Sequence, residues 1–286
     1  MDDRRSISIG TLNAGAVAFG DHSSATGSMD AVPEQAYPSS DRAYPSSDRV
    51  LLVVAADVEY QAVIQAVTDV TGVRSAVTYS ARQSSFTLGR ISRTDVRLAQ
   101  VGAGTVTPDA AGPALPDLLA DVRPGFVILV GICYGLKDSI QRMGDVLVAN
   151  ELRLAAHTKI GDRVIDRGGA VHPSPVLLNR FRSARASWAG RAEVHFGPMI
   201  SESVLVNSAG YREGLKARYP EAIGGEMEGA AVYAAAIRAR VEWGLVKAVC
   251  DWGFGKTDDH QRLAADNAAA FVTHMIATGG LDPVPR

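Results

Sequence analysis

The sequence predicts a single α/β domain built on a largely parallel sheet. Short, continuous apolar runs recur along the chain, as in the VLLVVA run that begins at Val50, and such runs are typical of strands covered on both faces. Segments with helical periodicity alternate with these runs. The alternation of strands and helices favours a parallel sheet that is flanked by helices.

Six strands and four helices are expected in this domain. The expected strands lie at 50–55, 96–101, 126–130, 144–149, 199–206 and 245–250. The expected helices lie at 58–70, in a segment that ends near 120, at 229–240 and at 261–276. Pro113 and Pro116 leave the start of the second helix open. Between 151 and 193 the pattern is mixed and predicts no defined element.

The first 49 residues differ from the rest of the chain. They are rich in Ser, Ala, Gly, Asp and Pro, and the heptad AYPSSDR at 36–42 is repeated without change at 43–49. Such a composition cannot bury enough apolar surface to offset the entropy lost on ordering. We therefore expect 1–49 to be a disordered tail and 50–286 to form the folded domain.

Composition excludes several classes of function. The formal net charge of -2 gives no general attraction to nucleic acid or to anionic membranes. No apolar run reaches the roughly 18 residues of a spanning helix, and no secretory signal is seen, so we expect a cytoplasmic location. Cys133 and Cys250 have apolar neighbours, which predicts buried, reduced thiols. Without HExxH or CxxC motifs we expect neither a metal nor a cofactor.

Acidic residues stand where predicted strands end or a predicted helix begins. Glu59 follows the first strand, and Asp251 comes directly after the last one. Glu226 and Glu228 flank Met227 just before the Ala-rich helix. Ligands of open α/β sheets bind outside the carboxyl ends of the strands, so we expect Glu59 and Asp251 to face one crevice.

These acids lie within motifs that resemble those of the nucleoside phosphorylase and nucleosidase superfamily, the group that contains methylthioadenosine/S-adenosylhomocysteine nucleosidase. The motifs are VVAADVEYQAV, VGAG, VILVGICYGL, MGDVLVAN, GGEMEGAAVYAAA and VKAVCDWG. EMEGAA, followed about twenty residues later by a strand ending in Asp, is the most specific of them. The resemblance covers 50–276. It implies a three-layer nucleoside-phosphorylase-like fold whose central sheet is mixed, largely parallel and flanked by helices.

The resemblance also implies roles for the acids. Glu59 matches the glutamate that activates water in the nucleosidases, and Asp251 matches the aspartate that protonates the purine at N7. Glu228 matches the glutamate that holds the ribose hydroxyls, Met227 would pack on the sugar, and Glu226 belongs to the same motif. Carboxyl groups suit this chemistry, because protonation eases departure of the base while a second acid activates water.

Two segments that would line the base pocket depart from the family pattern. MISESVLV matches the loop under the purine, where members often carry an aromatic ring, but this chain has Leu205 followed by Val206. GICYGL, with Ile132, Cys133 and Tyr134, replaces a smaller, hydroxyl-bearing version. Stacking on the base must therefore be weaker or come from elsewhere, and we expect Tyr134 to narrow or re-line the pocket.

Asp251 begins the segment DWGFGKT, which looks like the end of the phosphate-binding loop GxxxxGK[ST]. The first glycine of that loop would be Cys250, and the segment follows the last strand, so we reject an NTPase loop. CDWG with a following lysine instead resembles a branch of the superfamily found in multidomain defence and signalling proteins, some of which cleave nucleotides such as ATP. Lys256, Lys137 and Arg167 would then meet phosphates; otherwise they are solvated surface residues.

The sequence thus predicts a nucleosidase that hydrolyses the N-glycosidic bond of an adenine-type purine nucleoside or nucleotide and releases the free base. The expected partner is that small molecule, without nucleic acid or membrane, and the resemblance implies a homo-oligomer. One alternative is a phosphate-dependent purine nucleoside phosphorylase, but VGAG and GICYGL hold no arginine for phosphate. The other is a non-catalytic nucleotide-binding module, which would not need both Glu59 and Asp251. The 5′-substituent stays open.

Overall fold

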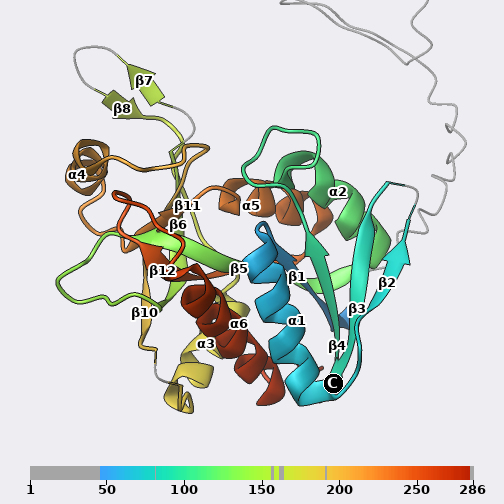
Figure 1. The fold of residues 1–286 in the computed structure, drawn as a ribbon. Helices are drawn as coiled ribbons and strands as arrows, with labels where there is room; N and C mark the ends of the chain where they lie inside the picture. The colour runs from blue at the N-terminus through green and yellow to red at the C-terminus, as the bar shows by residue number, and fades with distance from the viewer. Residues whose placement is uncertain (1–45, 81, 156–157, 161–163, 191, 284–286) are drawn as a thin grey trace, which may run out of the picture. The chain divides into compact units, whose positions relative to one another are not determined.

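A mixed, largely parallel sheet forms the centre of the protein (Figure 1). The computed structural model describes residues 46–80, 82–155, 158–160, 164–190 and 192–283, so most of the expected tail lies outside the described residues. The described strands of this sheet run in the order β11-β10-β6-β12-β5-β1-β4-β3-β2, with β9 paired to β6. The predicted α/β class and its layered sheet are confirmed.

The sheet contains β1 (Ser46–Val54), β2 (Ala76–Tyr79), β3 (Ser84–Ile91), β4 (Thr94–Gln100), β5 (Pro124–Gly135), β6 (Val146–Leu154), β9 (Ala170–Val171), β10 (Val194–Ser201), β11 (Gly224–Glu226) and β12 (Glu242–Asp251). β7 (Thr158–Ile160) and β8 (Val164–Asp166) form a separate hairpin. The helices are α1 (Asp57–Thr71), α2 (Ala111–Val122), α3 (Pro175–Ala186), α4 (Ala209–Arg218), α5 (Gly229–Ala239) and α6 (Gln261–Ala277).

Helices cover both faces of the sheet (Figure 1). Side chains of a strand alternate between the faces, so Leu52 of β1 packs with Val67 of α1 and Phe271 of α6, while Leu51 packs with α2 and α5 on the other side. The apolar runs that predicted the strands are therefore buried on both faces. This arrangement makes the three layers expected from the sequence.

The main differences from the predicted elements are in their extents. β1 begins at Ser46, four residues before the expected start of the domain. The strand expected at 199–206 is wrong in position, because β10 runs from Val194 to Ser201 and ends where its pairing with β6 and β11 ends. The strand expected at 126–130 continues to Gly135, since β12 and β11 both pair with its last residues.

Several elements were not predicted at all: β2, β3, β7, β8, β9, β11, α3 and α4. β2 is exposed along its whole length at the edge of the sheet, and β11 has three residues, so neither has a strong apolar pattern. None of the described helices is long and apolar enough to span a membrane.

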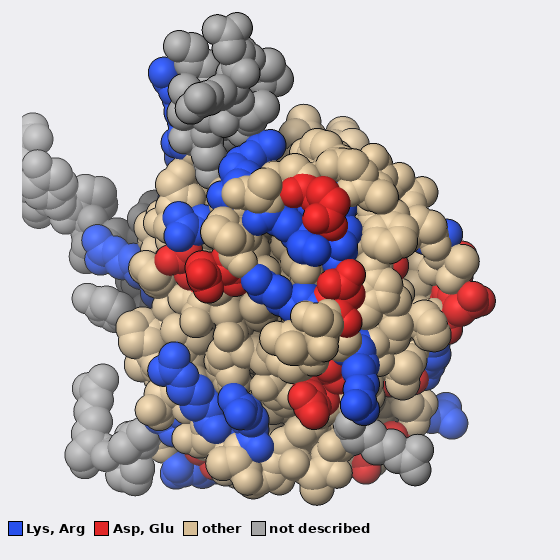
Figure 2. Space-filling model, turned by 90° about the vertical axis from the view of Figure 1, so that its left-hand side faces the viewer, with Lys and Arg blue, Asp and Glu red and all other residues tan. Residues whose placement is uncertain are grey.

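The side of the molecule that carries α4 and β10 has positive and negative side chains intermixed (Figure 2). On α4, for example, Lys216 forms an ion pair with Glu213. Neither sign of charge dominates this face, which agrees with the small net charge of the chain. A continuous basic surface of the kind that binds nucleic acid is not visible in this view.

Candidate active site

The carboxyl ends of β1, β5 and β12 lie side by side, because these strands are parallel neighbours. We call this the carboxyl edge. It carries the start of α1, directly after β1, and Asp251, the last residue of β12. β11 reaches the same place by pairing antiparallel with Tyr134 and Gly135 of β5, and it brings Glu226 with it. The fold thus collects acids from three separate parts of the sequence.

Glu59 is buried in the first turn of α1, and the backbone holds its carboxylate in place. Oε2 accepts hydrogen bonds from the N–H groups of Ala55 and Ala56 at 2.7 and 2.9 Å. Oε1 accepts one from the N–H of Ile132 in β5 at 2.7 Å. A carboxylate has about four acceptor sites, so one site on Oε1 is left for a further donor.

Lys247 is a buried ammonium that joins two of the acids. Its Nζ lies 3.3 Å from Oε2 of Glu228 and 3.6 Å from Oε1 of Glu59. Burial by itself would lower the pKa of Lys247, but the charges of Glu59 and Glu228 outweigh burial and raise the pKa well above its ordinary value. The other oxygen of Glu228 accepts a hydrogen bond from the N–H of Gly104 at 2.9 Å.

Sequence reasoning missed Lys247, although the strand pattern held a signal. The residue stands inside the apolar run LVKAVC of β12, and a lysine is almost never fully buried unless it is paired. A buried lysine in a core strand therefore predicts an acidic partner. Here it has two, and they are the residues matched to water activation and to ribose binding.

Gly131 makes room for the Glu59 carboxylate. A Cβ placed on Gly131 would lie 1.9 Å from Oε1 of Glu59, so Gly131→Ala must displace that carboxylate without removing its charge. We expect Gly131→Ala to fold, to lose about 1–3 kcal/mol of stability through overpacking and to lower kcat. Steady-state kinetics and urea unfolding check both effects. Wild-type kcat in this variant would show that the position of Glu59 does not matter.

Glu226, the last residue of β11, and Glu228, just before α5, form an acidic pair. Oε2 of Glu226 accepts hydrogen bonds from the N–H groups of Glu228 and Gly229 at 2.8 and 2.7 Å. Its Oε1 is buried and has no hydrogen-bond partner among the described residues. Burial, and then the charge of Glu228, raises the pKa of Glu226 to about 7. Glu226 thus holds a proton more readily than a free glutamate would.

The pKa of Glu226 gives a testable dependence of stability on pH. The pKa rises from 4.5 to about 7 on folding, so the folded protein binds this proton more tightly. The stability that the proton contributes is full below pH 4.5 and is lost as pH rises through about 7. Gln stays neutral at every pH. The stability of Glu226→Gln relative to wild type should therefore rise by on the order of 1–3 kcal/mol as the pH increases from about 5 to about 8. Urea unfolding of both proteins checks this; a difference that does not change with pH contradicts it.

Asp251 ends β12 and opens the loop to α6. Oδ1 accepts a hydrogen bond from the N–H of Gly253 at 2.6 Å, and Oδ2 lies 3.3 Å from Nζ of Lys256 and 3.2 Å from Sγ of Cys250. Burial first, then Asp251 and to a lesser degree Glu59, raises the pKa of the Cys250 thiol.

The residues expected to line the substrate pocket have different surroundings. Met227 is half-buried, and its Cε lies 4.0 Å from the position of a Cβ on Gly104. Leu205 is 67% exposed, whereas Val206 is buried beside Tyr134. Ile132 gives its N–H to Glu59, and Cys133 lies in the core under α2 and α5. None of these five residues supplies the aromatic ring that Leu205 lacks.

Tyr134 of β5 pairs with Asp251 of β12 on one side and with Gly225 of β11 on the other. Its ring covers Gly225, where a Cβ would lie 2.0 Å from the phenol oxygen. Its hydroxyl donates to Oε1 of Glu202 at 3.0 Å, and the hydroxyl of Tyr211 donates to Oε2 at 2.8 Å. Burial first, then Glu202, raises the pKa of Tyr134 well above its usual value. Glu202 was not predicted, although it stands in the MISESVLV segment.

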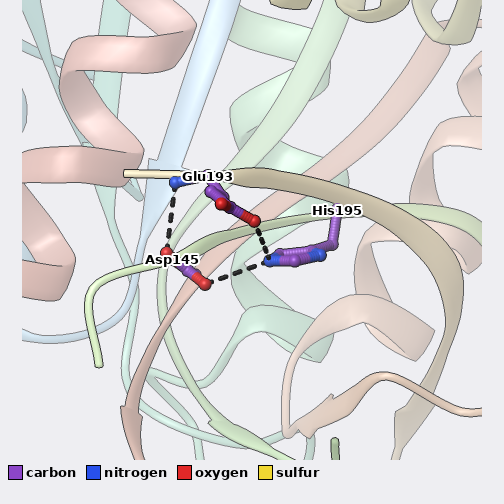
Figure 3. A group of neighbouring side chains, drawn as sticks. All are labelled: Asp145, Glu193 and His195. Atoms are coloured by element: carbon purple, nitrogen blue, oxygen red, sulfur yellow. Dashed lines mark hydrogen bonds and ion pairs between the residues drawn. The ribbon is translucent and has the colours of Figure 1, made fainter. Parts of the chain in front are cut away.

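Asp145, Glu193 and His195 form the one group of possible metal ligands among the described residues (Figure 3). Asp145 accepts hydrogen bonds from the N–H groups of Glu193 at 3.1 Å and Arg142 at 2.9 Å, and Nε2 of His195 lies 3.0 Å from it. The chain's own donors therefore occupy this carboxylate, which joins the start of β6 to the start of β10. We assign the group a structural role.

The comparison with family models decides the membership of the chain. Residues 49–277 match the model of the phosphorylase superfamily, which is most of the sequence. The chain belongs to this superfamily. The motifs from which the resemblance was inferred, and the edge at which the structure collects them, lie within the matched range.

Two nucleosidases are similar to this chain in sequence. The chain is 26% identical over 255 residues to a death domain-containing ATP nucleosidase of Amphimedon queenslandica, covering 79% of this chain and 48% of the relative, so the chain spans about half of that protein. It is 28% identical over 198 residues to the 5′-methylthioadenosine/S-adenosylhomocysteine nucleosidase of Haemophilus influenzae, covering 66% of this chain and 83% of the relative.

Solved structures confirm the fold. A 5′-methylthioadenosine/S-adenosylhomocysteine nucleosidase from Colwellia psychrerythraea, in complex with adenine, superposes with a TM-score of 0.69 at 20% identity. The match covers 83% of this chain and 97% of the other. The three-layer fold expected from the sequence is therefore the nucleoside-phosphorylase-like fold.

Proposed function

We propose that this protein is a nucleosidase that hydrolyses the N-glycosidic bond of an adenine-type purine nucleoside or nucleotide. The observation that carries the proposal is the buried bridge from Glu59 through Lys247 to Glu228, with Asp251 on the same edge. The names of the relatives support the same reaction, since they are nucleosidases for ATP and for methylthioadenosine and S-adenosylhomocysteine.

The bridge suits the binding of ribose and water together. Glu228 is fixed by Gly104 and Lys247, and its carboxylate accepts hydrogen bonds from two ribose hydroxyls. Oε1 of Glu59 keeps a vacant acceptor site, and its 3.6 Å separation from Nζ of Lys247 leaves the two groups without a direct hydrogen bond. A water at that position donates to Glu59 and is held beside the sugar carbon C1′.

In the cleavage step, Asp251 acts as the proton donor and Glu59 as the proton acceptor. The C1′–N9 bond breaks, its electron pair goes to the purine, and Asp251 supplies a proton to N7. The water adds to C1′ and gives its proton to Glu59. The carboxylates near the sugar stabilise the positive charge that develops there, and this stabilisation is strongest in the transition state. The products are the free base and a free sugar.

Hydrolysis fits the charges of the site better than phosphorolysis does. Inorganic phosphate as the nucleophile would need cations beside the sugar. Lys247 is the cation that the described residues place there, and it is already paired with two carboxylates. A phosphate ion beside Glu59 and Glu228 would meet like charges, whereas a water molecule meets an acceptor.

A substrate panel tests the proposal. Adenosine, methylthioadenosine, S-adenosylhomocysteine, inosine, AMP and ATP are each incubated with the protein, and release of free base is measured. We expect adenine release from at least one adenine compound at rates well above inosine. Tight binding of these compounds without any base release would assign the protein to non-catalytic nucleotide binding.

A homo-oligomer and a cytoplasmic location complete the proposal. The hydroxyls of Thr105 and Ser203 lie 2.7 Å apart and bring two loops together, and the neighbouring Val106 and Leu205 are 81% and 67% exposed. A second copy covering these apolar side chains would remove them from water. The two cysteines are free thiols, as a reducing compartment preserves them. Sedimentation velocity tests the oligomer.

The expected tail should be dispensable for turnover. No residue assigned to the site lies before Ser46, so a protein that begins at Tyr44 keeps β1 and its pairing of Ser46 with Pro124. We expect kcat and KM within about twofold of the full chain. A start at Asp48 would remove part of β1 and is the matched control for stability. A shortened protein that folds and has lost activity would contradict this expectation.

A further inference from the structure

The side chain of Lys256 contacts Asp251, the residue at which its own loop begins. The chain turns twice after Asp251, at Gly253 and Gly255, whose φ angles of 74° and 58° favour glycine. The backbone N–H of Lys256 donates to Oδ1 of Asn207 at 3.3 Å, which anchors this end of the loop. Its Nζ then lies 3.3 Å from Oδ2 of Asp251, with the Lys256 side chain 27% exposed.

The ion pair with Lys256 opposes the proposed role of Asp251 as the proton donor to N7. The N–H of Gly253 donates to Oδ1, while the ammonium of Lys256 and the thiol of Cys250 both lie beside Oδ2. Donors suit a carboxylate, whereas a carboxylic acid that is to give a proton to N7 needs an acceptor beside it. While Lys256 stays in this position it stabilises the carboxylate and opposes proton transfer to N7, so a substrate that draws the ammonium away favours the acid.

A purine nucleotide carries a group that can do this. In the anti conformation, N7 and the 5′-phosphate lie on the same side of the molecule. A purine whose N7 meets Asp251 therefore presents its 5′-phosphate within reach of a lysine that already stands beside Asp251. The flexible stem of lysine allows its head group to move between two anions without a change in the backbone.

We propose that Lys256 determines specificity for 5′-phosphorylated substrates: it leaves Asp251 to bind the 5′-phosphate and so frees Asp251 to donate to N7. This inference rests on the proposed nucleosidase activity. Asp251 takes up a proton from solvent once Lys256 has moved and delivers it to N7 as the C1′–N9 bond breaks. Water gives the new hydroxyl at C1′, and the products are the purine and a sugar 5-phosphate. A nucleoside without phosphate leaves Lys256 on Asp251 and reacts slowly.

The other basic residues suggested by the sequence are less suited to this role. Nζ of Lys137 donates to the carbonyl of Pro220. Arg167 is exposed in the segment between β8 and β9, and no ion pair with an acid of the site is found for it among the described residues. Lys256 differs from both because its partner is the carboxylate assigned to the chemistry. Phosphate binding at Lys256 is therefore coupled to catalysis, and it should raise kcat as well as lower KM.

The test compares AMP and ATP with adenosine in wild type, Lys256→Met and Lys256→Arg. A hydrogen bond to a charged group corresponds to about 10–100-fold, so we expect Lys256→Met to lower the ratio of kcat/KM for AMP to that for adenosine by about this factor. Part of the change should come from a higher kcat on adenosine, because Lys256→Met removes the ammonium that occupies Asp251. Lys256→Arg should restore much of the ratio. Lys216→Met, which removes a lysine of α4 paired with Glu213, is the matched control and should leave the ratio unchanged.

The outcomes separate this inference from the activity on which it rests. Adenine release by wild type with an AMP-to-adenosine ratio that Lys256→Met does not change would overturn the role of Lys256 and leave the nucleosidase intact. A wild type that prefers adenosine would overturn it as well. No base release from any compound would remove the proposed function itself. Melting temperatures of all variants show that the comparison is made on folded protein, with Lys256→Gln as the second neutral variant.

Discussion

Replacing Glu59 with Gln should lower kcat by about 10²-fold or more, the scale of general-base catalysis, while KM changes little. The amide cannot take a proton from the water that Oε1 of Glu59 would hold. Substrate binding should be kept, because Glu228 and Met227 hold the sugar in this account. Steady-state kinetics on the best substrate of the panel measure both parameters.

Glu59→Gln should also destabilise the protein, which the sequence alone did not predict. Both oxygens of Glu59 accept from backbone N–H groups, of Ala55 and Ala56 on one side and Ile132 on the other. The amide NH₂ must face one of these donors, and an unsatisfied buried donor costs about 1–3 kcal/mol. Kinetics are therefore measured well below the melting temperature of the variant. Near-normal turnover by the folded variant would remove Glu59 from the mechanism.

Asp251→Asn should lower kcat on the ordinary substrate by about 10²- to 10⁴-fold, since Asn cannot deliver a proton. Its carbonyl oxygen can still accept from the N–H of Gly253, so the turn after β12 should persist. The ion pair with Lys256 is lost, and Lys256→Met provides the control for that loss. The effect of the lost proton is the difference in kcat between Asp251→Asn and Lys256→Met, both measured on adenosine.

The leaving group identifies the cause of the Asp251→Asn defect. A 7-methylpurine nucleoside already carries a positive charge on its base, so it needs no proton at N7. We expect Asp251→Asn to be strongly impaired on the ordinary substrate and nearly as active as wild type on the 7-methyl analogue. Binding of the analogue is measured separately by competition. Equal impairment on both substrates would mean that Asp251 organises the loop and is not the acid.

The sequence predicted the central layers because their signal is local. Continuous apolar runs such as that of β1 report burial on both faces, and the Ala-rich pattern of α5 reports a helix packed against a sheet. β2 and α4 gave no such signal, because β2 is exposed and α4 is mostly polar. The end of β10 depends on its pairing with β6 and β11, which a single segment cannot show.

The candidate site likewise contains residues that the sequence could predict and partners that it could not. The acids could be named from motifs, since Glu59, Glu228 and Asp251 stand at strand ends and helix starts. Their partners could not be named, because Lys247 reaches Glu59 and Glu228 from a different strand and Lys256 folds back on Asp251 through two glycine turns. Tyr134 was expected to re-line the pocket, but its link to Glu202 depends on the path of β10.

The central claim is that water, and not phosphate, takes the purine's place on the sugar. Mass spectrometry of the sugar product, formed with excess inorganic phosphate present, tests this most directly. We predict free adenine and an equal amount of sugar with no phosphate at C1, at a rate that is the same without added phosphate. A sugar 1-phosphate as the main product, or a rate that depends on phosphate, would contradict the account and assign the protein to the phosphorylases.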